Sequence, residues 1–183
     1  MTSLQVRRLT YAALYLAISM VLPFLTGQIP EIGAMLCPMH IPALLCGFMC
    51  GWSWGAIVGF ISPLLRSVLF GMPTMFPEAI AMAFELAVYG GMAGLLYRLL
   101  PKKKWITYAV LLASMIAGRV VWGAVRLFLM GLSGGTFTWA FFLAGAVTDA
   151  IPGIILQLIL IPILVISMDR AGLSLNSAEV SKR

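Results

Sequence analysis

The sequence predicts an all-α integral membrane protein, a single domain over residues 1–183 folded as a compact bundle of six transmembrane helices with both termini cytoplasmic. Hydrophobic residues make up 62% of the chain and charged residues 10%, whereas a soluble domain carries about a quarter charged residues. The mean hydropathy is +1.04. Nine of the twelve cations lie at the ends of apolar segments, namely Arg7, Arg8, Arg98, Lys102, Lys103, Lys104, Arg170, Lys182 and Arg183. The net charge of +6 therefore orients the protein in a bilayer and does not indicate a nucleic-acid partner.

A helix needs about 20 residues to cross a hydrocarbon core about 30 Å thick. Apolar runs place the six spans at residues 9–25, 41–54, 55–70, 79–100, 105–132 and 138–168. The first run resembles a signal peptide in its charged start but lacks a small-residue cleavage site, so it is kept as a helix. The second and third are short and meet at Trp52-Ser53-Trp54, where aromatic rings suit the membrane interface. Pro73 and Pro77 shape the loop before the fourth span.

The basic segments set the orientation of the bundle. Arg7 and Arg8, the cluster 102–104 and the basic C-terminal end can share one side only if an even number of spans separates them. The predicted spans supply four crossings and then two. Because Lys and Arg accumulate on the cytoplasmic side, both termini are expected there. The polar tail after Met168 is expected to be an anchor or a frayed end.

Five ionisable side chains are expected within the bilayer: Arg66, Glu85, Arg119, Arg126 and Asp149. At 1.5 Å per helical residue, Arg66 lies about 8 Å and Glu85 about 10 Å below the outer end of its helix. Such groups usually mark a functional site facing the protein interior. An alternative is that they only pair and join helices, above all Arg119 with Asp149. Three cations against two anions leave one cation over, however, and an anionic ligand could pair with it.

The outer side carries further candidate binding residues. His40 lies between Pro38 and Pro42, and non-helical backbone at membrane depth is tolerated where it lines an enclosed cavity. Trp122 shares a helical face with Arg119 and Arg126 at the spacing i, i+3, i+7. Met39, Met75 and Phe76 supply apolar side chains for a lid. Together with the arginines and Glu85, these residues form the predicted binding site, although Met and Phe also serve as plain packing.

Several motifs of enzymes and metal sites are missing. No G-x-x-x-x-G-K-[ST] run is present for nucleotide hydrolysis, no G-x-S-x-G for a serine hydrolase and no H-E-x-x-H for a metalloprotease. Cys37, Cys46 and Cys50 lie in apolar surroundings and are expected to pack in the core. A zinc site built on Cys37 and His40 lacks further ligands. We therefore expect no catalytic activity, no cofactor and no metal.

Two features resemble a known family: the pair Ala13-x-x-x-Ala17, and the runs PMHIPALLCGFMCG and GFISPLLRSVLFGMPTMFPEAIAMAFELAVYG within residues 38–90. They are similar to the substrate-binding S components of energy-coupling factor (ECF) transporters, in the branch that includes pantothenate-type components. The resemblance implies a vitamin-binding pocket at the outer face, closed by the loops after the first and third helices. It also implies docking on a membrane-embedded coupling subunit with two cytoplasmic ATPases. In this family Ala13 and Ala17 match the helix-contact motif.

The resemblance leaves alternatives open. Met39-His40-Ile41-Pro42 is similar to the start of nickel and cobalt members, but here the run is internal, so the amino-terminal ligand is absent and metal uptake is not expected. The preferred reading is a non-enzymatic capture subunit in the prokaryotic plasma membrane for a small anionic vitamin. Pantothenate is the first candidate; cobalamin, a pyrimidine precursor, folate and a queuosine-type base are others. The alternatives are an autonomous small permease or channel, and a scaffold whose buried charges only pair helices.

Overall fold

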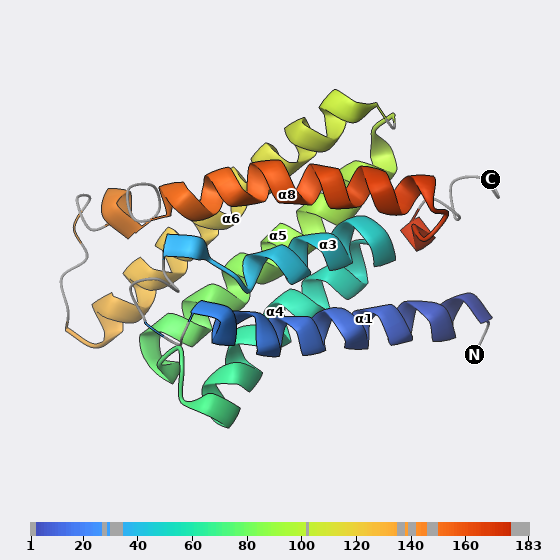
Figure 1. Ribbon diagram of the computed structural model, residues 1–183. Helices are drawn as coiled ribbons and strands as arrows, with labels where there is room; N and C mark the ends of the chain where they lie inside the picture. The colour runs from blue at the N-terminus through green and yellow to red at the C-terminus, as the bar shows by residue number, and fades with distance from the viewer. Residues whose placement is uncertain are drawn as a thin grey trace.

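The computed structural model of the chain describes residues 3–26, 29, 35–101, 103–134, 138, 142–145 and 150–176. Within these ranges the chain is helical and contains no strand (Figure 1). The elements are α1 (Ser3–Val21) with the 3-10 helix η1 (Leu22–Thr26), α3 (His40–Cys50), α4 (Trp52–Phe70), the π-helical turn η2 (Met75–Ala79), α5 (Ile80–Leu99), α6 (Lys104–Leu132) and α8 (Ile151–Arg170). The predicted all-α class is therefore confirmed for the described residues.

Five segments of the described chain are long and apolar enough to cross a membrane, and one expected span is shorter than predicted. The five are Leu4–Leu25, Trp52–Phe70, Met75–Leu99, Lys104–Leu132 and Ile151–Arg170. The expected span 41–54 is instead the 11-residue helix α3, about 16 Å long at 1.5 Å per residue. A helix of that length covers about half of the hydrocarbon core.

Two helix boundaries differ from the prediction. The break between the second and third spans falls at Gly51, which has φ 99°, and Trp52 already belongs to α4. A positive φ suits glycine because it has no Cβ, and hydropathy alone carries no such signal. The last helix begins at Ile151 instead of residue 138; of the stretch before it, only residues 138, 142–145 and 150 are described.

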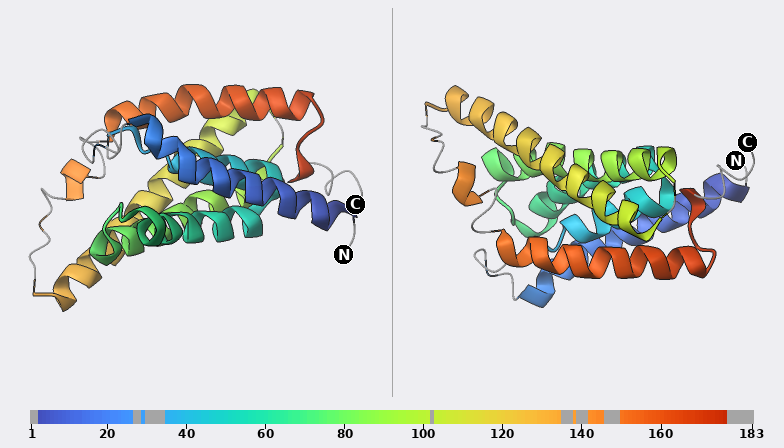
Figure 2. Two further views of the ribbon diagram at one scale, coloured as in Figure 1. Left: turned by 60° about the horizontal axis from the view of Figure 1, so that its bottom comes forward. Right: turned by 90° about the horizontal axis from the view of Figure 1, so that it is seen from above.

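The short helix α3 lies at the centre of the bundle, and each of its residues is buried. It packs against α1, α4, α5 and α8 (Figure 2). Glycines bring α4 and α5 into backbone contact: a Cβ on Gly59 would lie 2.2 Å from the Leu86 carbonyl oxygen, and one on Gly90 would lie 2.3 Å from the Gly55 oxygen. Gly55 and Gly59 thus allow the close packing of α4 against α5.

The start of α1, the α5–α6 connection and the end of α8 lie at one end of the bundle, called here the basic end (Figures 1 and 2). Arg8 donates a hydrogen bond to the Leu175 carbonyl at 3.3 Å, and the Tyr97 hydroxyl donates one to Asp169. The three basic segments therefore share a side, as predicted.

Residues 173–176 are not a frayed tail. Leu175 and Asn176 are each 2% exposed, and the Asn176 side-chain amide donates a 3.1 Å hydrogen bond to the Gly94 carbonyl. A Cβ on Gly51 would lie 3.6 Å from the Asn176 side-chain oxygen. The segment thus covers the end of α3 and holds the basic end of the bundle together, as the first of the two roles expected for the tail, an anchor, requires.

Candidate functional site

The segment before α3 has a helical turn at residues 35–36 and enters the bundle through the non-helical residues 37–39. A Cβ on Gly153 of α8 would lie 2.6 Å from the Met35 carbonyl oxygen, so this segment runs directly against α8. Cys37 has φ 46° and is 7% exposed. Irregular backbone at membrane depth is tolerated where protein surrounds it. As a result α3 starts inside the bundle, and its first residue, His40, lies about 16 Å from the basic end.

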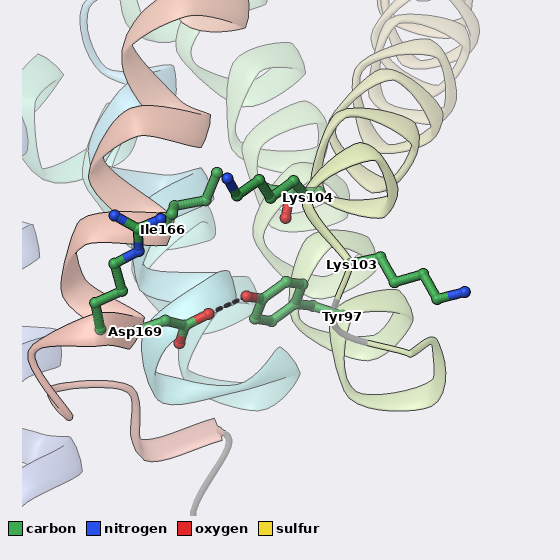
Figure 3. Close-up of a pocket in the computed structure, with 7 residues that line it drawn as sticks. Tyr97, Lys103, Lys104, Ile166 and Asp169 are labelled. Atoms are coloured by element: carbon green, nitrogen blue, oxygen red, sulfur yellow. Dashed lines mark hydrogen bonds between the residues drawn. The ribbon is translucent and has the colours of Figure 1, made fainter.

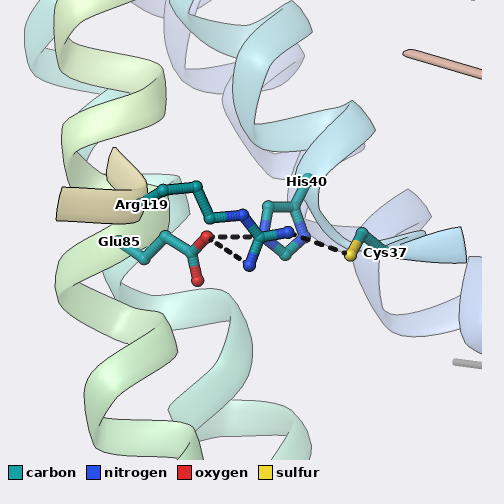
Figure 4. A network of polar contacts seen from close by, with 4 residues as sticks. All are labelled: Cys37, His40, Glu85 and Arg119. Atoms are coloured by element: carbon teal, nitrogen blue, oxygen red, sulfur yellow. Dashed lines mark hydrogen bonds and ion pairs between the residues drawn. The ribbon is translucent and has the colours of Figure 1, made fainter. Parts of the chain in front are cut away.

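Four side chains from this segment, α3, α5 and α6 meet there, and we call them the polar cluster: Cys37, His40, Glu85 and Arg119 (Figure 4). Glu85 Oε1 lies 3.1 Å from Arg119 Nη1 and 3.3 Å from His40 Nε2. Arg119 also donates from Nη2 to the Cys37 sulfur at 3.4 Å. Glu85 is 1% exposed and His40 3%. A carboxylate this deeply buried is stable only beside a cation and hydrogen-bond donors.

Tyr89 completes the surroundings of the cluster. It lies one turn after Glu85 on the same face of α5. Its ring centroid is 5.1 Å from that of His40. A Cβ on Gly118 of α6 would lie 2.5 Å from the Tyr89 ring. The glycine therefore provides the space in which this ring can lie between α5 and α6.

The polar cluster retains hydrogen-bonding capacity. Four of its buried atoms have no hydrogen bond within the described part of the chain: His40 Nδ1, His40 Nε2, Glu85 Oε1 and Arg119 Nε. Glu85 Oε1 is within ion-pair distance of Arg119 and His40, but not in hydrogen-bonding geometry. Most buried polar atoms in proteins do have a partner. The cluster can therefore accept further hydrogen bonds from, or donate them to, a polar group placed against it.

A second charged pair lies further from the basic end, where η2 meets α6. Arg126 forms an ion pair with Glu78, and its guanidinium carbon lies 5.4 Å from the centroid of the Trp122 ring. Trp122 is 4% exposed and packs at 6.3 Å from the Phe142 ring. Side-chain exposure is 12% for Arg126 and 33% for Glu78. We call Arg126 and Glu78 the rim pair.

Arg66 lies apart from both groups, against the end of α1. It is 2% exposed and donates from Nη1 to the Met20 carbonyl at 2.6 Å. Its guanidinium carbon lies 5.0 Å from the Phe24 ring and 5.1 Å from the Phe70 ring. Among the described residues, no carboxylate forms an ion pair with Arg66. Of the three arginines Arg66, Arg119 and Arg126, Arg66 is the one without an ion-pair partner among the described residues.

The structure describes the surroundings of some of the expected site residues and leaves others outside its range. Arg119 pairs with Glu85, whereas the pairing considered from sequence was with Asp149, which lies outside the described residues. Met75 and Phe76 on η2 are 41% and 50% exposed, and neither belongs to the polar cluster. Met39 is 4% exposed and belongs to a buried cluster with Ala43 and Leu86, against which Met20 packs.

Sequence reasoning missed the aromatic partners of the charged groups. Tyr89 follows Glu85, and Phe70 follows Arg66, by four residues. Side chains at i and i+4 share a helix face, so this spacing could have indicated both contacts. Phe24, which lies against Arg66 from η1, had no such local signal, since its helix is far away in sequence.

Ala13 and Ala17 lie on the outer face of α1. Both are exposed, while Ala12, Tyr15 and Ser19 of the same helix are buried. The two small side chains thus point away from the bundle, and α1 presents a smooth stripe on which another helix could pack closely.

A comparison with protein families finds one match. The family model described as ECF transporter, substrate-specific component matches residues 7–165. This range contains the polar cluster, the rim pair and Arg66. No curated protein and no solved structure matches the chain.

Proposed function

Because the chain belongs to the family of ECF transporter substrate-specific components, we propose that it captures a small, water-soluble, anionic vitamin, with pantothenate as the first candidate. Members of this family are membrane-embedded, substrate-binding subunits of a transporter. The chain is a multi-pass membrane protein. We propose both the identity of the ligand and the residues that bind it.

The polar cluster supports this proposal because several of its buried atoms can still form hydrogen bonds with a ligand. Both ring nitrogens of His40 are buried without a hydrogen bond in the described structure. Leaving such atoms unpaired in a protein interior costs about 1–3 kcal/mol for each group. A ligand carrying hydroxyl, amide or carboxylate groups would satisfy them, and pantothenate carries all three. The orphaned atoms therefore support a polar ligand bound against His40, Glu85 and Arg119.

Charge supports an anionic ligand. The polar cluster and the rim pair contain Arg119 with Glu85 and Arg126 with Glu78, and Arg66 adds a cation with no carboxylate partner among the described residues. Guanidinium groups form strong, charge-assisted hydrogen bonds with carboxylates. Trp122 and Met39 would line the apolar part of the pocket, and Met75 and Phe76 on η2 would close over it.

The remaining elements fit a subunit that works with partners. The basic end would face the cytoplasm of a prokaryotic cell, which leaves η2 and the rim pair at the outer side. The exposed face of α1 at Ala13 and Ala17 would contact the membrane-embedded coupling subunit, and two cytoplasmic ATPases would drive release. A chain without a P-loop motif needs such a source of energy.

Substitution of His40 tests whether this residue binds the ligand, by comparing its effect on ligand affinity with its effect on stability. His40→Phe keeps a ring against Tyr89 but removes the Nε2 contact with Glu85, which remains paired with Arg119, so the free energy of unfolding should fall by no more than about 1–3 kcal/mol. Binding of radiolabelled pantothenate to the purified protein in detergent should weaken at least about tenfold, the effect of roughly 1.4 kcal/mol. If this variant binds pantothenate as tightly as the wild type does, His40 is not part of the binding site.

The ion pairs also favour a second candidate, in which the charges only join helices. Glu85 with Arg119 connects α5 to α6, which is what a scaffold would need. Under that alternative the wild type carries no small molecule through purification and binds no vitamin, while the loss of the His40–Glu85 contact in His40→Phe still lowers stability. An autonomous permease would instead transport pantothenate in liposomes without an ATPase partner.

A further inference from the structure

At the basic end, the structure contains a cavity of about 410 Å³ between the α5–α6 connection and the end of α8 (Figure 3). This volume lies within the range of ligand pockets, about 300–1,000 Å³. Its polar lining includes Lys103, Lys104, Arg170, Tyr97 and Asp169. The cavity lies at the opposite end of α5 and α6 from the rim pair, so it is separate from the proposed vitamin site.

The cavity has an excess of positive charge. Three cations and one carboxylate line it, and the carboxylate accepts a hydrogen bond from the Tyr97 hydroxyl. Neither Lys104 nor Arg170 forms an ion pair within the part of the chain that the structure describes. The α6 helix begins at Lys104 without a side-chain cap, and the N-terminus of a helix adds partial positive charge. These features favour the binding of an anion in the cavity.

Apolar surface continues from the cavity along both helices. On α6, Tyr108 and Leu112 follow Lys104 at steps of four residues and are 42% and 44% exposed. On α8, Ile163 and Ile159 lie on the face of Ile166, which lines the cavity, and are 55% and 58% exposed. These stripes lead from the cavity toward the middle of the bilayer. A ligand with an anionic head and acyl chains matches both surfaces, whereas a free anion matches only one.

The neighbouring residues place the cavity at the membrane interface. Trp105 directly follows Lys104 and is 66% exposed, and Leu99 at the end of α5 is 69% exposed. Exposed Trp beside Lys is typical of the headgroup level. Basic pockets between helices at this level bind phosphate-bearing lipid headgroups.

We infer that this cavity binds the phosphate of an anionic phospholipid, with Lys104 and Arg170 as its contacts. The headgroup lies between the start of α6 and the end of α8, and the acyl chains lie along the exposed stripes of the two helices. The lipid thereby holds the two helix ends together at the interface. The inference requires only that the chain spans a membrane, and it does not depend on which vitamin the protein captures.

Native mass spectrometry of the full-length protein in detergent tests the inference. Phosphatidylglycerol and phosphatidylcholine with identical acyl chains are titrated separately, and inorganic phosphate is titrated in a third arm. Lys104→Gln and Arg170→Gln each remove one lining cation. Both side chains are exposed, so folding is retained. Arg7→Gln, an exposed cation at the same end but outside the cavity, is the matched control.

The wild type should bind phosphatidylglycerol more tightly than phosphatidylcholine. Each cavity variant should weaken phosphatidylglycerol binding about fivefold, the effect of about 1 kcal/mol per cation, while Arg7→Gln stays within about twofold. Equal binding of the two lipids, or an equal loss in Arg7→Gln, would overturn the inference. Binding of inorganic phosphate as tight as that of phosphatidylglycerol would assign the cavity to a soluble anion and overturn the lipid assignment.

Discussion

Glu85 on α5 and Arg119 on α6 form an ion pair of 3.1 Å inside the bundle, where Glu85 is 1% exposed. The same carboxylate lies 3.3 Å from His40 on α3. One acidic group thus connects three helices. Because water does not screen charges at this depth, the interaction is stronger than a surface pair and more costly to break.

We expect Glu85→Gln to destabilise the protein strongly. The substitution keeps the size of the side chain but leaves the Arg119 guanidinium buried without a counter-charge. Breaking a buried pair from one side costs about 3–5 kcal/mol. The free energy of unfolding, measured by denaturant titration of the purified protein in detergent, should fall by about that amount. The double variant Glu85→Gln with Arg119→Gln should recover part of the loss.

Glu78→Gln is the matched control for this prediction. It makes the same isosteric change in the rim pair, where the Glu78 side chain is 33% exposed. Ion pairs that reach solvent contribute at most about 1 kcal/mol, so the loss should be smaller. If Glu85→Gln and Glu78→Gln lower the free energy of unfolding equally, the burial of an ion pair does not determine how much it stabilises this protein.

Gly90→Ala should separate α4 from α5. Its Cβ would lie 2.3 Å from the Gly55 carbonyl oxygen, a contact that neither backbone can relieve without moving. Overpacking of this kind costs about 1–3 kcal/mol. Gly91→Ala, one residue further along the same helix, meets the Ala56 Cβ at 3.5 Å and the Trp52 carbonyl oxygen at 3.9 Å, both ordinary contacts, and should be neutral or stabilising, because Ala favours helix over Gly. Thermal unfolding of the two variants compares them directly.

Leu175→Ala should weaken the closure of the basic end. Leu175 is 2% exposed, and truncating a buried Leu to Ala costs at least about 2 kcal/mol when the site cannot collapse. Leu173→Ala changes the same residue type at a position that is 37% exposed and should cost less than about 1 kcal/mol. Protease cleavage near the C-terminus should speed up in Leu175→Ala and not in Leu173→Ala. Cleavage at the wild-type rate in Leu175→Ala would mean that the segment does not depend on this anchor.

Arg66→Met tests whether the unpaired cation contacts the ligand. A Met side chain can fill the space between Phe24 and Phe70, but it has neither the charge nor the hydrogen bond to Met20. Hydrogen bonds from charged groups contribute about 1.5–3 kcal/mol, so stability should fall by about that amount. Binding of pantothenate should fall at least about tenfold. If stability falls and pantothenate affinity does not, Arg66 only secures α1 to α4.

Much of the fold follows from one-dimensional features of the sequence. Hydropathy located the long helices, and the basic clusters at Arg8, 102–104 and Arg170 indicated their shared end. The length of α3 did not follow, because the apolar run 41–54 passes the same hydropathy test although Gly51 ends the helix. The burial of Leu175 and Asn176 could not be predicted either, because no local sequence pattern indicates that a polar tail packs against the bundle.

The residues of the candidate site could be proposed from the sequence, but the contacts between them could not. Depth along each helix follows from residue counting, so Arg66, Glu85 and Arg119 were placed correctly within the bundle. Which charge meets which depends on how each helix is rotated about its axis. That rotation is set by glycine contacts such as those of Gly59 and Gly118 with neighbouring helices. The pairing of Arg119 with Glu85, and the distance of Arg66 from both, therefore required the three-dimensional structure.

The central claim, that this protein captures a polar small molecule against the polar cluster, is tested most directly by native mass spectrometry of the wild type purified from membranes. We expect the folded protein to carry an additional mass in the range of a vitamin, which is released on unfolding and is absent from His40→Phe. The same additional mass on both proteins would contradict the assignment of the site. A wild-type protein that carries no small molecule and takes up no added pantothenate would contradict the proposal of pantothenate capture.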